Sequence, residues 1–173
     1  MSNRFGNRTD RPGFVPSIRL PESSGGKRFF HVIGTAVWQT DVPAHGGDRH
    51  FLGMRDDVEC WAVDVPVGDD PAGGAALDLR VLYAKVDEID WAIAGRAVQL
   101  VEWARTHRFC GRCATPTEPV EGERAMRCPN CRLLSFPRLA PAIITLITRG
   151  DQALLARGVQ FPVSALTVRS VSA

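Results

Sequence analysis

Two cysteine pairs constrain this chain more than any other feature of its sequence. Cys110 and Cys113 form one C-x2-C pair, Cys128 and Cys131 form a second, and fourteen residues separate the pairs. Cysteines at this spacing can turn both sulfurs toward one point, and two such pairs complete a tetrahedral shell about 2.3 Å from a Zn²⁺ ion. We therefore expect a structural zinc, because four protein ligands leave no open coordination position for catalysis.

The residues around the cysteines fit such a zinc ribbon. Gly111 and Asn130 tolerate unusual backbone angles and are expected to shape the two tight turns. The segment 114–127, with two prolines and a glycine, can form the hairpin between them. An iron centre of the rubredoxin kind has the same ligands and is the alternative metal. Cys60, next to Trp61 in an apolar run, is interpreted as a small buried residue rather than a nucleophile.

Composition places the chain among ordinary globular proteins. It has 173 residues, 45% of them apolar and 23% charged, which allows one domain or two small ones. The longest apolar run, Ala142–Ile147, is far shorter than the roughly 20 residues that a membrane helix needs. No apolar segment follows the charged residues Met1–Asp10, so a secretory signal is not expected. These features predict a cytoplasmic protein without a membrane partner.

Hydrophobic periodicity predicts an α+β fold. The clearest helix is 87–108, where apolar residues recur every three or four positions behind Asp87 as the N-cap. Trp91 and Trp103 flank this stripe and are expected to pack. The expected strands are 29–39 with a bulge at Gly34, 50–54, 59–65 and 79–82, and a hairpin formed by a buried strand 142–148 and a returning strand 153–156.

This pattern divides the chain into four expected parts. A loosely packed segment 1–27, rich in Gly, Pro and Ser, precedes a small mixed α/β domain over 28–108. The zinc ribbon covers 109–135, and 136–173 contains the hairpin. Charge divides the chain differently: residues 1–123 have 18 acids and 14 bases, whereas residues 124–173 have seven arginines and one acid, Asp151.

Several short motifs occur in order along the chain, at residues 51–53, 61–64, 101–103, 107–113 and 136–144. Together they resemble the NADH pyrophosphatase family of Nudix hydrolases, which also remove NAD caps from RNA, and the resemblance extends over residues 28–157. It implies an N-terminal α/β domain, a zinc ribbon and then a Nudix domain. The implied activity is Mg²⁺- or Mn²⁺-dependent hydrolysis of NAD(H), free or as an RNA cap, to nicotinamide mononucleotide and AMP, in a possible homodimer. It also implies that Phe136 stacks on the nicotinamide side of the substrate and that Ile144 lines the same pocket.

The sequence departs from this family at the catalytic helix. The Nudix pattern G-x5-E-x7-R-E-x2-E-E-x-G does not occur, and the last glutamate is Glu123. Divalent cations prefer several oxygen ligands, so we expect an incomplete Nudix domain that is inactive alone, as in a truncated or frame-shifted product. An alternative function is a zinc-ribbon module that binds nucleic acid or protein through a basic patch containing Arg124, Arg127, Arg132 and Arg138.

Overall fold

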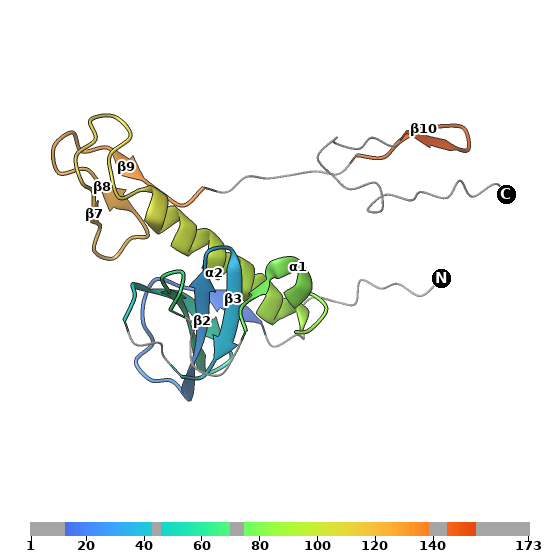
Figure 1. The fold of residues 1–173 in the computed structure, drawn as a ribbon, viewed down its shortest axis with the longest axis horizontal. Coiled ribbons are helices and arrows are strands. Elements are labelled where there is room, and N and C mark those ends of the chain that lie inside the picture. Colours follow the sequence, from blue (N-terminus) through green and yellow to red (C-terminus); the bar gives the residue numbers. More distant parts are fainter. Residues whose placement is uncertain (1–12, 43–45, 70–74, 139–144, 155–173) are drawn as a thin grey trace. The chain divides into compact units, whose positions relative to one another are not determined.

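The centre of the structure, a computed structural model, is a six-stranded mixed sheet (Figure 1). The strand order across the sheet is β1-β4-β5-β2-β3-β6. Strand β2 is parallel to β5, and the other neighbouring strands are antiparallel. The strands are β1 (Phe14–Pro16), β2 (Gly26–Ile33), β3 (Ala36–Thr40), β4 (Arg49–Arg55), β5 (Val58–Asp64) and β6 (Leu77–Asp78).

The structure describes residues 13–42, 46–69, 75–138 and 145–154. The chain divides into two units, Met1–Arg138 and Leu139–Ala173, and each is described by itself. In the second unit, the described residues form a hairpin of β10 (Ile147–Arg149) and β11 (Gln152–Leu154), as the sequence predicts at this point. The described residues of β10 are exposed, however, whereas the apolar sequence predicts a buried strand.

The inner strands β2 and β5 are buried on both faces of the sheet. Phe30 and Cys60 belong to the core on the helix side, whereas Phe29 and Val63 belong to a smaller cluster on the other side. Successive residues of a strand point to opposite faces, so a strand covered on both sides is apolar at nearly every position. The middle of each strand, residues 29–33 and 60–63, is accordingly almost entirely apolar, and the charged residues Lys27, Arg28, Glu59 and Asp64 lie toward the strand ends.

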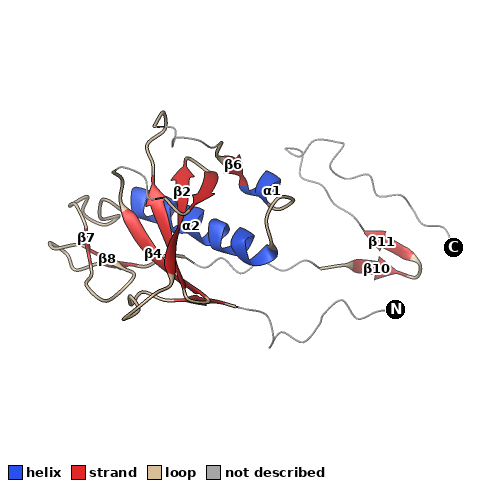
Figure 2. Ribbon diagram, turned by 90° about the horizontal axis from the view of Figure 1, so that it is seen from below, coloured by secondary structure: helices blue, strands red, loops and turns tan. Residues whose placement is uncertain are grey.

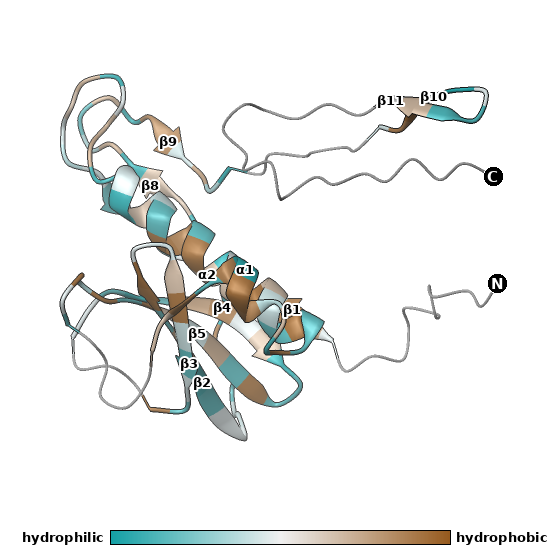
Figure 3. Ribbon diagram, turned by 45° about the vertical axis from the view of Figure 1, so that its right-hand side comes forward, coloured by the Kyte–Doolittle hydropathy of each residue, from teal (hydrophilic) through white to brown (hydrophobic). Residues whose placement is uncertain are grey.

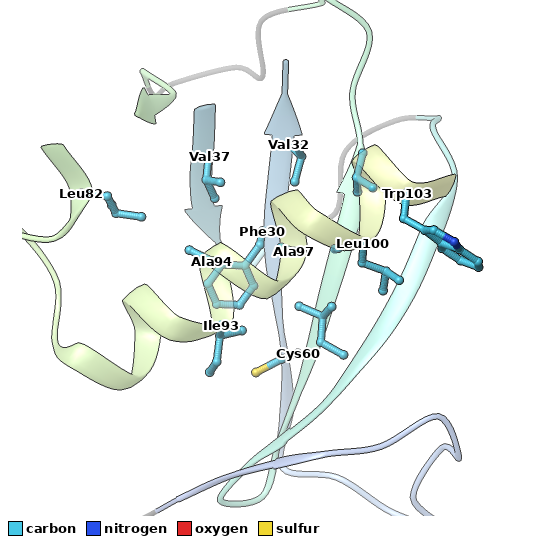
Figure 4. Packing of buried hydrophobic residues seen from close by; sticks show 13 residues of the cluster. Phe30, Val32, Val37, Cys60, Leu82, Ile93, Ala94, Ala97, Leu100 and Trp103 are labelled. Atoms are coloured by element: carbon cyan, nitrogen blue, oxygen red, sulfur yellow. The ribbon is translucent and has the colours of Figure 1, made fainter. Parts of the chain in front are cut away.

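Helix α2 (Glu88–Thr106) lies along one face of the sheet (Figure 2). Asp87 is its N-cap, as predicted, and its carboxylate accepts the backbone N–H groups of Ile89 at 2.9 Å and Asp90 at 3.0 Å. The apolar stripe of α2 is visible in Figure 3 and packs on the strands to form the core (Figure 4). The core residues are Phe30, Val32, Val37, Leu52, Cys60, Ala62, Leu82, Ile93, Ala94, Ala97, Leu100, Val101 and Trp103.

The tryptophans of the helix pack as the sequence predicts. Trp103 is 8% exposed in the core. Trp91 is partly buried and donates its indole N–H to the carbonyl of Leu79 at 2.8 Å. Because no helix among the described residues combines the length and apolar character needed to cross a bilayer, none of them is a membrane-span candidate.

Three predicted elements differ from the structure. Segment 29–39 is not one bulged strand: Gly34, with φ of 60°, makes a turn between β2 and β3, and the bulge lies in β4 between Phe51 and Gly53. Segment 79–82 is not a strand but the short helix α1 (Leu79–Leu82), because the Asp78 carboxylate accepts the N–H of Arg80 and caps it. Finally, the expected loose segment before residue 28 contains β1, which pairs with β4.

Candidate metal centre

Residues 109–138 form a small three-stranded sheet around the cysteines. Its strands are β7 (Glu118–Pro119), β8 (Met126–Arg127) and β9 (Leu134–Ser135), paired antiparallel in that order. Each strand has two residues, and the buried residues of this segment are Cys110, Ala125 and Cys128. So little buried apolar surface cannot hold the segment by itself, which makes its cysteines the main candidates for stabilisation.

The four sulfur atoms of the cysteine pairs converge at one point of this ribbon. Sγ of Cys110 lies 3.4 Å from Sγ of Cys131, and Sγ of Cys113 lies 3.5 Å from Sγ of Cys128. All four lie within 4.8 Å of one another, and no other group of three or more potential metal ligands occurs among the described residues. A tetrahedron with arms of about 2.3 Å has edges of about 3.8 Å, so the cage has the size that Zn²⁺ requires.

The two cysteine pairs build their halves of the cage with the same backbone hydrogen bonds. The N–H of Cys110 donates to the carbonyl of Thr115 at 2.8 Å, and the N–H of Cys128 donates to the carbonyl of Leu133 at 3.0 Å. In both pairs the donor is the first cysteine and the acceptor lies five residues later. The equal spacing of the pairs in the sequence therefore corresponds to two equivalent turns in the structure.

The unusual backbone angles of these turns do not occur where the sequence places them. Gly111 and Asn130 do not have positive φ; Ala114 and Arg132 do, with φ of 57° and 61°. Each follows the second cysteine of its pair, and its N–H donates to the carbonyl of the first cysteine, at 2.8 and 3.0 Å respectively. The hydrogen bond that closes the turn thus imposes the left-handed angle on a residue with no special preference for it.

The protonation of the thiols shows why the cage needs a cation. A hydrogen bond with the hydroxyl of Thr115, 3.3 Å away, lowers the pKa of Cys113 to about 6. At Cys131 the N–H of Leu133 lowers the pKa, but burial and the neighbouring cysteines outweigh it and raise the pKa to about 11. Four thiolates this close repel one another, so their joint ionisation requires a positive ion among them.

Arg124 fixes the ribbon to the α+β domain. It lies between β7 and β8, and its Nη2 donates to the carbonyl of Ser17 at 2.9 Å and to that of Phe51 at 2.7 Å. Met126 packs against the core of the α+β domain from the same segment. Sequence reasoning assigned Arg124 to a basic patch, but the structure places it in a contact within the chain. The sequence contains no signal for this contact, because its acceptors are backbone carbonyls.

The remaining candidate residues have different outcomes. Phe136 lies just beyond β9 and is 51% exposed, so it is accessible from solvent. Ile144 lies outside the described residues. Cys60 is fully buried in the core, where burial raises the pKa of its thiol to about 11. A neutral buried thiol is inert, which confirms the interpretation of Cys60 as a packing residue.

The fold and the sulfur cage together define a zinc-ribbon protein with an α+β domain. Comparison with family models makes this more specific. Residues 15–103 match the NADH pyrophosphatase-like rudimentary NUDIX domain, and residues 105–136 match the NADH pyrophosphatase zinc ribbon domain. The chain belongs to the NADH pyrophosphatase family. The match to a zinc ribbon supports a structural zinc, and the four-sulfur cage has the ligands for it.

Individual relatives agree with this family. The chain is 48% identical over 167 residues to a protein of Deinococcus radiodurans, covering 90% of this chain and 59% of the relative. It is 39% identical over 113 residues to a protein of Pseudomonas fluorescens (65% and 41%) and 42% identical over 115 residues to one of Stutzerimonas stutzeri (66% and 40%). All three are named NAD-capped RNA hydrolase NudC. The chain thus spans between two fifths and three fifths of the length of these relatives.

Proposed function

We propose that this chain is the N-terminal and zinc-ribbon portion of an NAD(H) pyrophosphatase, whose substrates are NAD(H) and NAD-capped RNA. The observation that carries this proposal is the ordered match of both family domains over residues 15–136. The names of the relatives support the capped RNA as a substrate class. The reaction is hydrolysis of the pyrophosphate bond to nicotinamide mononucleotide and AMP.

The 173 residues do not supply the divalent-cation site of this reaction. Mg²⁺ and Mn²⁺ prefer several carboxylate oxygens, and residues 124–173 contain one carboxylate, Asp151. Asp151 lies between β10 and β11, and no acidic cluster occurs among the described residues. We infer that the chain by itself does not hydrolyse NAD(H).

Further parts of the proposal concern the substrate contact and the assembly. Exposed Phe136 offers an aromatic face, the chemistry that stacks on a nicotinamide ring, and Ile144 would line the same pocket. We also propose a zinc ribbon bounded by residues 109 and 135, a cytoplasmic location and a homodimer. Size-exclusion chromatography with light scattering tests the dimer, since a mass near 18.9 kDa at micromolar concentration contradicts it.

A direct assay tests the proposed inactivity. The zinc-loaded chain is incubated with NADH, or with NAD-capped RNA, in the presence of Mg²⁺ or Mn²⁺, and the release of AMP or of uncapped RNA is measured. The relative from Deinococcus radiodurans, assayed in parallel, is the positive control. We expect no product above the blank for the present chain. Turnover comparable with that of the control would show that the carboxylate argument is wrong.

The exposed face of the ribbon sheet favours a second function, the binding of nucleic acid. Arg127 pairs with Leu134 across β8 and β9, so both side chains lie on one face, and both are exposed together with Phe136. Arginine and an exposed aromatic ring are the groups that contact phosphates and bases of single strands. Binding of a single-stranded RNA that weakens with rising salt supports this function, and undetectable binding in a gel-shift titration removes it.

A further inference from the structure

A cavity of about 360 Å³ lies in the α+β domain between β3, β6 and the segment that joins α1 to α2. Small-ligand sites in proteins occupy roughly 300–1,000 Å³, so this cavity has room for one small molecule. A second cavity of the same volume is lined by Arg28, Arg55, Asp56, Val58, Asp87 and Asp90. There, ion pairs of Arg28 and Arg55 with the aspartates already balance most of the charge. The first cavity differs because it is lined by both apolar and charged side chains.

The inner wall of the first cavity is aliphatic. Val37 and Leu82 line it and are buried in the core, and Leu77 and Val86 line it and are partly buried against the same core. Val37 and Leu77 are paired across β3 and β6, so their side chains lie on one face of the sheet. Leu82 extends from α1 toward β3 (Figure 4). An apolar group placed against this wall is removed from water, which favours its binding.

Hydrogen bonds hold this wall in place. The backbone N–H groups of Lys85 and Val86 both donate to the carbonyl of Leu82, at 2.9 and 3.2 Å. This turn after α1 places Lys85 and Val86 beside the cavity that Leu82 also lines. The indole N–H of Trp91 donates to the carbonyl of Leu79 at 2.8 Å and so connects α1 to α2. A site formed before its ligand arrives loses less conformational entropy on binding.

The rim of the cavity has two cations and one exposed carboxylate. Lys85 is exposed and has no ion-pair partner among the residues that the structure describes. Arg28 contacts Asp90 through Nη1 at 3.3 Å and the exposed carboxylate of Asp41 through Nε at 3.8 Å. A guanidinium group has five N–H donors, so Arg28 has donors left for a ligand. An aliphatic wall behind two cations is complementary to an organic anion.

We propose that this cavity is a binding site for a small organic anion, a molecule with an apolar body of one or two rings and a single carboxylate or phosphate group. The apolar body lies against the aliphatic wall. The charged group accepts hydrogen bonds from Lys85 and Arg28, which are stronger than hydrogen bonds between neutral groups. The site is separate from the cysteine cage and does not depend on the proposed hydrolase function.

The experiment titrates the zinc-loaded, ¹⁵N-labelled 173-residue chain with 1-naphthoate and follows the amide chemical shifts. We expect saturable shifts within residues 37–41 and 77–86, with a Kd of about 1 mM for a ligand of this size. 1-Naphthyl phosphate is the second ligand, and the tighter of the two identifies the preferred charged group. The neutral 1-naphthalenemethanol cannot pair with the cations, so it is expected to bind about tenfold more weakly.

Two charge variants test the rim of the cavity. Lys85→Gln removes an exposed cation and is expected to weaken 1-naphthoate binding about threefold while leaving the binding of 1-naphthalenemethanol unchanged. Arg80→Gln is the matched control, because Arg80 is an exposed cation of α1 that does not line the cavity. It should leave the binding of both ligands unchanged. Equal weakening by the two variants would overturn the proposal.

A third variant tests the aliphatic wall. Leu77→Phe enlarges a side chain that lines the cavity, so it should abolish the shifts caused by every ligand of the series. If this variant does not fold, the comparison of Lys85→Gln with Arg80→Gln still decides the outcome. The proposal is also overturned if 1-naphthoate at about 10 mM causes no shifts in the wild type, or if the shifts are centred outside residues 37–41 and 77–86.

Discussion

The α+β domain and the zinc ribbon are each stabilised by a different interaction. Thirteen buried residues between the sheet and α2 form the core of the domain. In residues 109–138 the buried residues are Cys110, Ala125 and Cys128, and two of the three are ligands of the cage. The domain therefore depends on the removal of apolar surface from water, and the ribbon depends on a metal ion.

This difference determines how each region is expected to fail. A hydrophobic core loses stability in increments as single side chains are shortened, because each contributes part of the buried surface. A four-ligand metal site is lost as a unit, since the thiolates repel one another once the ion leaves. The following predictions test whether the two regions respond independently, although Arg124 and Met126 connect them.

The largest effect is expected from zinc removal. Structural zinc sites contribute on the order of 10 kcal/mol to the folding of small ribbons, so a strong chelator should unfold residues 109–138. Hydrogen exchange measured by mass spectrometry should show lost protection there, with protection of β2, β5 and α2 retained. Cys128→Ser should have the same effect, and Cys60→Ser should leave the zinc content unchanged. Simultaneous unfolding of both regions would contradict their independence.

The core substitution Phe30→Ala has the next largest expected effect. Phe30 is fully buried between the sheet and α2, and its removal is expected to cost about 3–5 kcal/mol in the free energy of unfolding. Urea unfolding followed by tryptophan fluorescence measures this loss. Phe109→Ala is the matched control, since Phe109 is 64% exposed, and its expected cost is within about 0.5 kcal/mol. Zinc affinity of the folded Phe30→Ala protein should equal that of the wild type.

A smaller effect is expected at the polar network of the domain. Asp90 is 7% exposed and contacts Arg28 at 3.3 Å, Arg55 and the Gln39 amide at 3.3 Å. Asp90→Ala leaves these groups without their acceptor, and a loss of about 2 kcal/mol is expected because solvent partly screens the arginines. Asp41→Ala is the control, since this exposed carboxylate forms only a 3.8 Å contact with Arg28. Equal losses in the two variants would contradict the assigned role of Asp90.

The smallest predicted effect is the change in the free energy of unfolding when the pH falls and Glu59 is protonated. Glu59 accepts hydrogen bonds from Ser24 at 2.6 Å and Trp61 at 2.8 Å, and the Ser24 hydroxyl in particular holds its pKa below the usual 4.5. Its contribution is therefore complete above pH 4.5 and is lost as the pH falls through the lower, folded-state pKa. Glu59→Gln should lose about 1 kcal/mol at pH 7 and less at pH 3, whereas exposed Glu22→Gln should be neutral at both. Unfolding curves at the two pH values provide the test.

The two regions also differ in the group whose protonation destabilises them at low pH. The cage needs thiolates, so protons compete with zinc and metal affinity falls as the pH falls. In the domain, the acid-sensitive group is a carboxylate. Zinc release that occurs at a higher pH than the loss of domain stability would sharpen the comparison.

Sequence reasoning was most reliable for features that depend on near neighbours. The C-x2-C spacing located the cage, and the three- and four-residue periodicity located α2 and its Asp87 cap. It was less reliable where one turn decides between two structures. Gly34 ends a strand instead of bulging it, because β3 turns back to pair with β2. Asp78 caps the segment Leu79–Leu82 and starts a helix there.

Contacts between residues that are far apart in the sequence were not predictable from such local patterns. Asp90 lies in the first turn of α2 and contacts two arginines from β2 and β4, Arg28 and Arg55, which are far from it in the sequence. Likewise, nothing in the sequence associates Arg124 with the carbonyls of Ser17 and Phe51.

The amino-acid sequence by itself determined the zinc cage, the helix and the family, since each depends on residue spacing within a few turns of chain or on short motifs. Only the tertiary structure decided that β2 lies parallel to β5 and that Arg124 reaches the bulge of β4. The physical reason is that spacing along the chain fixes distances over one or two turns, whereas contacts between distant segments depend on how whole elements pack.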